Sequence, residues 1–317
     1  MNDIDVVIPT LNCANKLSKC IKSLKRQRYG GNLKMIVVDS GSIDDTVSVA
    51  KNNGCRVYTL PGKHSDGVNG ARQFGIDKGD SEFVWLVDSD NYLVEDDVAD
   101  RLMKPFFFDP SIQMTMPEPL VDKTLSTFNN YLSLYESYCV AQMKNHSERR
   151  DGWCTIPDVS YGITNCTILR RTAIAAVEGY DEDVRVLARL RKLHLSRGCI
   201  SEKSHYYHET ADSFLQFFRK CERRLLFFAQ MDSEALNSYF AGSPSIGDVS
   251  NLSNHTVLFK SNLTKSILSQ PLNFIVNFIQ TGDVTWLYGL GSLLIGFGLL
   301  MRHSSQSFKV LSLLSNL

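Results

Sequence analysis

The most informative sequence in the chain is Phe83-Val84-Trp85-Leu86-Val87-Asp88-Ser89-Asp90-Asn91-Tyr92. Its five leading apolar residues do not alternate with polar ones, which is typical of a strand buried on both faces of a parallel sheet. Asp88 and Asp90 follow directly, and open α/β sheets bind their ligands at the carboxyl ends of such strands. Two carboxylates one residue apart suit a hard divalent cation whose other ligands are phosphate oxygens. As an alternative, these acids would cap a helix predicted over residues 94–107.

Strands and helices alternate before this stretch. Short β-branched runs and helical spacing of apolar residues predict, in order, a strand at 5–8, a helix at 14–28, a strand at 35–38, a helix ending near 52, a strand at 56–60, a helix at 68–78 and a strand at 83–87. This order predicts an α/β domain with a mostly parallel central sheet. The first strand is not followed by G-x-G-x-x-G, and the chain has no G-x-x-x-x-G-K-[ST], which disfavours dinucleotide dehydrogenases and P-loop enzymes.

The second predicted strand also ends in a candidate binding residue. Asp39 stands at that strand end, where its carboxylate could accept a hydrogen bond from the N–H of a nucleotide base. Gly41-Ser42 follow, and a small turn of this kind lets a flat ring approach the backbone. A plain turn without a ligand is the alternative.

Charge and cysteine content limit the class of protein. The 317 residues carry equal numbers of basic and acidic side chains, so the net charge gives no electrostatic reason to expect a nucleic-acid partner. The eight cysteines form no C-x-x-C pair and no Cys/His metal spacing. We therefore expect reduced thiols in a cytosolic environment.

The last third of the chain differs in composition from the rest. Residues 213–241 predict an aromatic and basic amphipathic helix, which suits docking on the preceding domain or lying on an anionic membrane. Residues 242–265 have the composition of a linker. Residues 266–317 predict membrane-associated helices, because 284–301 contain no charged residue and are about long enough to span a bilayer. A buried hairpin of a soluble domain is the alternative for this last segment.

Four motifs stand in an order that is found in one enzyme family. They occupy residues 6–12 (VVIPTLN), 37–46 (VVDSGSIDDT), 69–75 (NGARQFG) and 88–90 (DSD). Together they resemble the family 2 glycosyltransferases of the GT-A fold, and the resemblance extends over residues 4–225. It implies a GT-A-type nucleotide-sugar-binding catalytic domain at residues 1–212, followed by the C-terminal amphipathic and membrane helices.

The resemblance also implies roles for individual residues. A Mn²⁺ or Mg²⁺ ion would be held by Asp88 and Asp90, with His208 as a further ligand. Arg72 would contact the donor diphosphate or pair with one of these acids. Trp153 would bind the acceptor as a platform on which a sugar stacks, or would simply pack in the fold. The residues expected to bind the nucleotide donor are Pro9, Thr10, Asn12, Asp39, Gly41, Ser42, Arg72, Asp88 and Ser89.

An acidic turn supplies candidates for the general base. Gly179-Tyr180-Asp181-Glu182-Asp183 resembles a compressed version of the family's acceptor-side acidic motif, which usually has more residues between its two acidic parts. We select Asp183 as the base, with Glu182 and Asp181 as alternates. One base and one direct displacement would invert the anomeric configuration.

These inferences predict a metal-dependent inverting glycosyltransferase. Its donor would be a nucleoside-diphosphate sugar, and the acceptor would be a hydroxyl or phosphate of a lipid-linked molecule or a glycan. We expect it at the cell membrane, with the catalytic domain facing the cytoplasm. One alternative is a catalytically inactive, membrane-anchored protein that binds nucleotide sugars, and a second is a nucleotidyltransferase.

Overall fold

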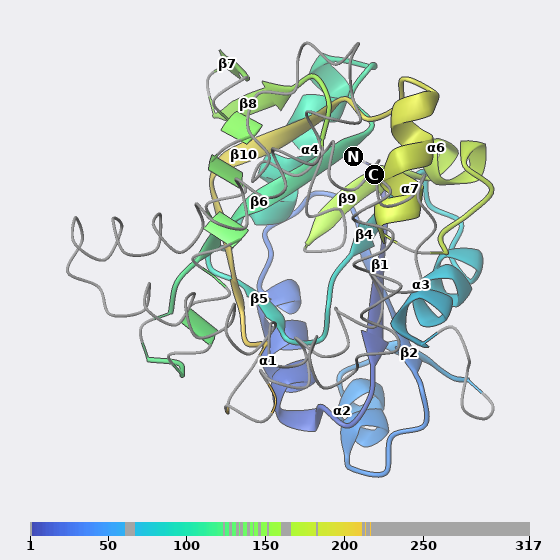
Figure 1. Cartoon of the computed structure of the whole chain (residues 1–317). Helices are drawn as coiled ribbons and strands as arrows, with labels where there is room; N and C mark the ends of the chain where they lie inside the picture. The colour runs from blue at the N-terminus through green and yellow to red at the C-terminus, as the bar shows by residue number, and fades with distance from the viewer. Residues whose placement is uncertain are drawn as a thin grey trace, which may run out of the picture. The chain divides into compact units, whose positions relative to one another are not determined.

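Figure 1 shows the computed structural model of the chain. It describes residues 2–60, 67–122, 124–126, 129–130, 133, 136–137, 140–141, 143–144, 147–150, 152–159, 166–181, 183–210, 213 and 216. The chain divides into two compact units, one formed by Met1–Leu120 with Glu136–Glu209 and the other by Val121–Tyr135 with Thr210–Leu317. The first unit holds the sheet and the candidate site.

The first part of the sheet is parallel, as the alternation of elements predicts. Its strands lie in the order β3 (Arg56–Thr59), β2 (Leu33–Asp39), β1 (Ile4–Thr10) and β4 (Phe83–Leu86), each parallel to its neighbour. This strand order places the carboxyl ends of β2, β1 and β4 at one edge of the sheet. The acids that follow β2 and β4 therefore belong to the same edge.

The second part of the sheet is mixed. β9 (Thr167–Arg170) lies antiparallel between β4 and β6 (Met114–Leu120), and β6 runs parallel to β10 (Gly198–His208). β8 (Trp153–Ile156) and β7 (Glu148–Arg150) then extend the sheet in antiparallel pairs. The prediction of a mostly parallel sheet is thus correct for the first four strands, whereas in the second part only the β6–β10 pair is parallel among the described strands. Antiparallel neighbours need no crossover helix, so the strand–helix alternation of the first half gives no signal for this part.

A short strand changes the predicted connection after the acid pair. β5 (Asn91–Leu93) pairs antiparallel with the end of β10. The next helix, α4 (Val98–Phe108), consequently begins later than predicted, with Asp97 at its N-cap position. Asp88 and Asp90 are separated from that helix by β5, so they do not cap it.

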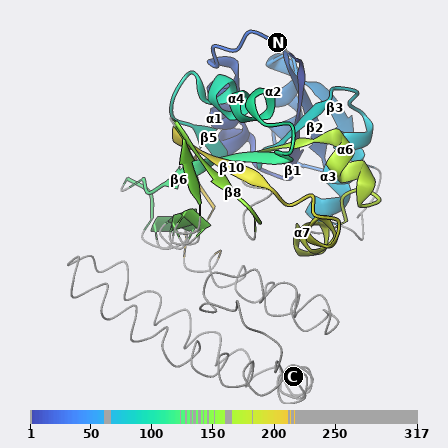
Figure 2. The same cartoon turned by 90° about the horizontal axis from the view of Figure 1, so that it is seen from above.

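Helices cover both faces of the sheet. Figure 2 shows α1 (Ala14–Lys25), α2 (Thr46–Asn52) and α4 on one face and α3 (Gly67–Asp77), α6 (Arg171–Ala176) and α7 (Asp183–Lys192) on the other. Alternate residues of β1 explain how two cores form, because Val6 packs in the cluster that contains Leu17 of α1, whereas Val7 packs in the cluster that contains Ile76 of α3. The unit is therefore a helix–sheet–helix sandwich.

The predicted C-terminal elements lie outside the described residues. This applies to the linker at 242–265, to the helices at 266–317 and to all but residues 213 and 216 of the amphipathic extension at 213–241. Among the residues that the structure describes, no helix has the length and apolar character needed to cross a bilayer.

Candidate active site

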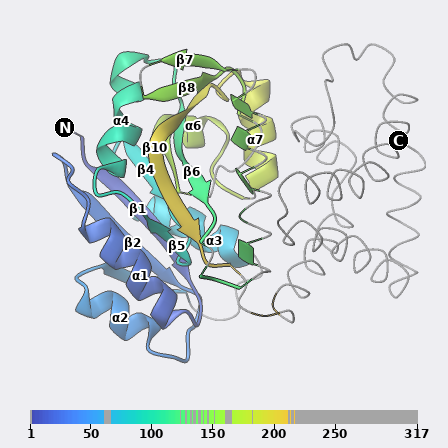
Figure 3. The ribbon, with the colours of Figure 1, turned by 90° about the vertical axis from the view of Figure 1, so that its left-hand side faces the viewer.

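Two acids and one histidine converge at the carboxyl end of β4. Asp88, Asp90 and His208 each present one donor atom, and these atoms all lie within 4.8 Å of one another. β10 brings the histidine there: it runs from β8 to β5 (Figure 3), and His208 pairs with Asn91 directly beside the acids. The Glu209 amide also donates a hydrogen bond to the Asp90 carbonyl at 2.8 Å. The strand pairing therefore fixes the backbone of His208 next to the acid pair.

The His208 ring lies between two carboxylates. Nδ1 lies 2.8 Å from Glu136 Oε1, and Nε2 lies 3.4 Å from Asp90 Oδ1. Burial by itself would lower the pKa of His208, but the carboxylates of Glu136 and Asp90 outweigh it and raise the pKa to about 10. The two carboxylates therefore favour the charged form of the imidazole.

The chemistry of these donors fits a divalent cation. Two carboxylates and an imidazole supply three ligands and leave room for phosphate oxygens. Carboxylates suit Mg²⁺ and Mn²⁺ alike, and imidazole is also a common ligand of divalent metal ions. The donor set therefore fits either of the two predicted ions.

Arg72 connects this cluster to the acidic turn. Its Nη2 lies 2.6 Å from Asp88 Oδ1 and its Nη1 lies 3.4 Å from Asp183 Oδ1, while the arginine side chain is only 5% exposed. Burial raises the pKa of Asp88, and the nearby Arg72 opposes this rise. Of the two predicted roles of Arg72, the structure shows the pairing with a motif acid. A carboxylate from α7 is thereby held close to Asp88.

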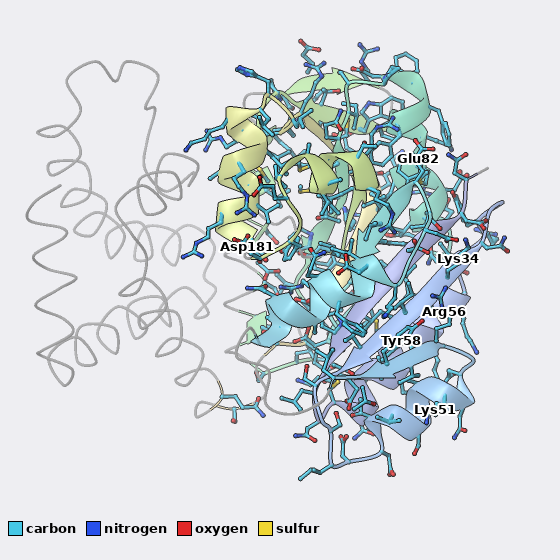
Figure 4. All side chains as sticks on the ribbon, turned by 90° about the vertical axis from the view of Figure 1, so that its right-hand side faces the viewer. Lys34, Lys51, Arg56, Tyr58, Glu82 and Asp181 are labelled. Atoms are coloured by element: carbon cyan, nitrogen blue, oxygen red, sulfur yellow. The ribbon has the colours of Figure 1, made fainter. Side chains whose placement is uncertain are left out.

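The three candidates for the base have different surroundings. Asp183 is the first residue of α7 and accepts hydrogen bonds from the Tyr180 hydroxyl and from Arg72. Asp181 forms two hydrogen bonds with Arg189, at 2.6 and 3.0 Å, and Figure 4 shows it at the start of α7. Glu182 lies outside the described residues. Asp183 contacts Arg72, which also contacts Asp88 of the metal cluster.

The predicted donor residues form a network of loops after β1 and β2. Asp39 is buried and accepts hydrogen bonds from the Gly41 and Ser42 amides, at 3.1 and 3.0 Å, and from the Ser42 hydroxyl. Asn12 has a φ of 48° and accepts a hydrogen bond from the Ile43 amide at 2.8 Å. The Asp39 carboxylate thus shapes the turn that was predicted to bind a base, and the loops after both strands are joined.

Three other predicted donor residues lie close to these loops. Pro9 pairs with Val38 within the sheet, and Thr10 is buried with its hydroxyl 3.4 Å from the Val38 carbonyl. Ser89 receives a hydrogen bond from the Cys13 thiol at 3.2 Å, which ties the acid motif to the start of α1. These contacts place the residues beside the predicted donor site without themselves identifying a ligand.

Trp153 is not brought to the metal cluster. It pairs with Ser201, near the opposite end of β10 from His208, and seven residues of strand correspond to about 20 Å. Its ring makes an edge contact with Phe108 of α4, with the ring centroids 5.7 Å apart. Of its two predicted roles, the contacts support packing, and they give no support to acceptor binding.

Two residues of the site were not selected from the sequence. Tyr180, which belongs to the acidic motif, is buried and hydrogen-bonded to Asp183. Glu136 is the second, and its spacing offers a signal. It stands four and seven residues before Val140 and Met143, which are apolar, so a charged side chain falls on the buried face of a helix.

The matches to known proteins include the same part of the chain. A family model described as Glycosyl transferase family 2 matches residues 5–176. A GalNAc(5)-diNAcBac-PP-undecaprenol beta-1,3-glucosyltransferase of Campylobacter jejuni is 34% identical over 108 residues, which are 33% of this chain and 35% of that protein. A PGL/p-HBAD biosynthesis glycosyltransferase of Mycobacterium tuberculosis is 33% identical over 104 residues, which are 31% of this chain and 39% of that protein. The chain thus spans little more than a third of the length of these relatives.

Solved structures share the fold. The mannosyltransferase PcManGT from Pyrobaculum calidifontis, in complex with GDP-Man and Mn²⁺, has a TM-score of 0.55 and 16% identity over 99% of this chain and 85% of that one. S. aureus TarS 1–349, in complex with UDP-GlcNAc, has a TM-score of 0.51 and 16% identity over 97% and 92%. At these identities the likeness shows the fold alone.

Proposed function

The chain belongs to glycosyltransferase family 2 and is a glycosyltransferase that uses nucleotide sugars, and we propose that it transfers the sugar with inversion to a lipid-linked acceptor. The convergence of Asp88, Asp90 and His208 at the carboxyl edge of the parallel strands carries this proposal. That edge is where an α/β sheet binds a nucleotide. Membership of this family also argues against the alternative that the chain is a nucleotidyltransferase.

Asp88, Asp90 and His208 would hold Mn²⁺ or Mg²⁺. When bound, such an ion neutralises the charge that develops on the diphosphate leaving group. The complex of PcManGT with GDP-Man and Mn²⁺ supports this assignment by analogy of fold. The nucleoside binds to the loops after β1 and β2, where the Asp39 turn and Asn12 shape the surface.

Asp183 acts as the general base. It takes the proton of the acceptor hydroxyl while the hydroxyl oxygen forms a bond to the anomeric carbon. The bond from that carbon to the phosphate oxygen breaks, and the nucleoside diphosphate leaves. Arg72 and the Tyr180 hydroxyl hold the Asp183 carboxylate in place, and a single displacement inverts the anomeric configuration.

The acceptor is an undecaprenyl-type lipid-linked phosphate or glycan at the cell membrane. The relative from C. jejuni is named for a PP-undecaprenol-linked substrate, which supports a lipid-linked acceptor for this chain. Residues 284–301, which contain no charged residue, would supply membrane attachment. The basic residues Arg219, Lys220, Arg223 and Arg224 would face anionic headgroups, and the catalytic domain would face the cytoplasm.

A donor screen with the full-length chain tests this function. Thermal unfolding would be followed with UDP- and GDP-sugars in the presence and absence of Mn²⁺, and transfer would then be assayed with polyprenyl-linked acceptors. We expect Asp90→Ala to abolish transfer and metal-dependent donor binding while the fold survives. Asp80→Asn is the matched control, because the Asp80 side chain is 83% exposed and forms a surface ion pair with Lys34 at 3.1 Å. Full activity of Asp90→Ala would overturn the metal assignment.

A further inference from the structure

We propose that Glu136 is a positioning residue of the metal site: its carboxylate holds Nδ1 of His208, so that Nε2 faces Asp88 and Asp90. This inference rests on the proposed function, because it concerns the same cation. The distances that carry it are 2.8 Å from Glu136 Oε1 to His208 Nδ1 and 3.4 Å from His208 Nε2 to Asp90 Oδ1.

The two ring nitrogens of a histidine have separate tasks in such a site. A nitrogen that binds a metal must present a lone pair, so the proton of the neutral ring must lie on the other nitrogen. Because Glu136 accepts a hydrogen bond from Nδ1, it favours the tautomer in which Nε2 is free to bind. It also fixes the rotation of the ring about its bond to the strand.

Glu136 is itself held firmly in this position. Its second oxygen, Oε2, accepts a hydrogen bond from the Tyr206 hydroxyl at 3.3 Å, so one carboxylate contacts two side chains of β10. The Glu136 side chain is 7% exposed, and that of His208 is 10% exposed. A carboxylate buried to this degree keeps its charge only when it has partners, and β10 provides them.

Packing of the surrounding helical residues sets the position of Glu136. Val140 and Met143 lie four and seven residues further on and pack in the core cluster that contains Met114 and Ile200. Such spacing places all three residues on one face of a helix. Lys144 forms an ion pair with Glu118 of β6 at 2.8 Å, which anchors the same helical segment to the sheet.

The chain contains a matched pair outside the site. His205 Nδ1 lies 2.6 Å from Glu95 Oε1, a contact of the same kind on the same strand. His205 does not belong to the metal cluster of the described residues. Removal of Glu95 therefore reproduces the loss of a Glu–His contact without touching the ring that faces the acids.

The experiment measures metal binding rather than turnover. Binding of Mn²⁺ to the full chain, in the presence of UDP or GDP, would be followed by electron paramagnetic resonance of free Mn²⁺. We expect Glu136→Ala to weaken Mn²⁺ binding about 10- to 100-fold, as loss of an outer partner of a metal ligand typically does. Glu136→Gln should weaken it less, since the amide oxygen still accepts from Nδ1 but carries no charge. Glu95→Ala should bind Mn²⁺ as the wild type does.

A second readout reports on the ring itself. With ¹⁵N-labelled histidine, electron spin echo measurements should detect nitrogen coupled to Mn²⁺ in the wild type and not in His208→Ala, and the coupling should be weakened or lost in Glu136→Ala. A merely structural role for Glu136 would lower the melting temperature and leave this coupling intact. If Glu136→Ala does not fold, the Glu136→Gln variant serves as the test. Wild-type affinity for Mn²⁺ together with an unchanged nitrogen coupling in Glu136→Gln would overturn the proposal.

The controls separate this inference from the proposed function. If Asp90→Ala and His208→Ala both weaken Mn²⁺ binding while Glu136→Ala does not, the metal site stands and the role of Glu136 is wrong. If His208→Ala binds Mn²⁺ like the wild type, the imidazole is no ligand and the inference fails by itself. If the wild type binds no Mn²⁺ with either nucleotide, the proposed metal dependence fails and the inference fails with it.

Discussion

Arg72 donates a hydrogen bond of 2.6 Å to Asp88 from a side chain that is almost completely buried. Burial alone would lower the pKa of Arg72, but the carboxylates of Asp88 and Asp183 outweigh it and raise the pKa. The guanidinium is therefore always charged, and its two Nη atoms reach one acid each. No other side chain type can span the two carboxylates in this way, because a lysine ammonium is a single point charge.

We expect Arg72→Lys to fold and to lose at least about tenfold in kcat, since one ammonium cannot hold Asp88 and Asp183 together. Arg72→Met should lower the free energy of unfolding by about 3 kcal/mol, because it leaves the carboxylates of Asp88 and Asp183 without the cation that they share. Chemical denaturation and steady-state kinetics measure the two effects. Arg191→Met is the control, since Arg191 pairs with Asp158 at 2.7 Å near the surface and should contribute less than about 1 kcal/mol. Wild-type kcat in Arg72→Lys would contradict the bridging role.

Asp183→Asn tests the choice of base. The amide keeps the size of the side chain and its contact with the Tyr180 hydroxyl but cannot take a proton, so kcat should fall about 10²- to 10⁴-fold. Binding of the nucleotide sugar should be retained, which thermal shift or calorimetry would show. Asp181→Asn serves as the comparison, because Asp181 is engaged by Arg189 and should retain most of the turnover. A larger loss of kcat in Asp181→Asn or in Glu182→Gln would identify that residue as the general base instead.

Substitution of Trp153 separates packing from acceptor binding. Because its ring contacts Phe108 and lies at the far end of β10 from His208, Trp153→Phe should leave the acceptor KM unchanged. Trp153→Ala should lower the free energy of unfolding by about 2 kcal/mol, less than for a fully buried ring, without a separate effect on KM. A tenfold higher acceptor KM in a stable Trp153→Phe protein would instead support the stacking role.

The sequence predicted the part of the site that is encoded locally. A continuous apolar run marked β4, and its end located Asp88 and Asp90, since both signals lie within a few residues. Pro9 shows a limit of this approach, because the first strand was predicted at residues 5–8, just before this proline, whereas β1 continues to Thr10. β4 pairs with β1 only as far as Val7, so Pro9 lacks a strand neighbour on that side and its missing N–H removes no bond there.

Contacts between segments that are far apart in the chain could not be predicted from the sequence. His208 was proposed as a ligand, but the pairing of β5 with β10 that places it beside Asp90 leaves no periodic signal in a three-residue strand. The contact of Glu136 with His208 joins residues 72 positions apart. It depends on helix packing as well as on strand pairing, and neither is visible in the spacing of residues in one chain.

The position of Arg72 depends on how closely α3 approaches the sheet, and Gly75 sets that distance. A Cβ atom at Gly75 would lie 2.4 Å from Val7 Cγ1 and 3.1 Å from Val38 Cγ2, so Gly75→Ala must push α3 away from β1 and β2. Overpacking of this kind costs about 1–3 kcal/mol, which exceeds the gain of up to about 1 kcal/mol in helix propensity. Arg72 precedes Gly75 by one helical turn, so we also expect kcat to fall. Adding Val7→Ala removes the closest methyl group, and a double-mutant cycle should show a favourable coupling between the two changes, whereas additive losses would place the strain elsewhere.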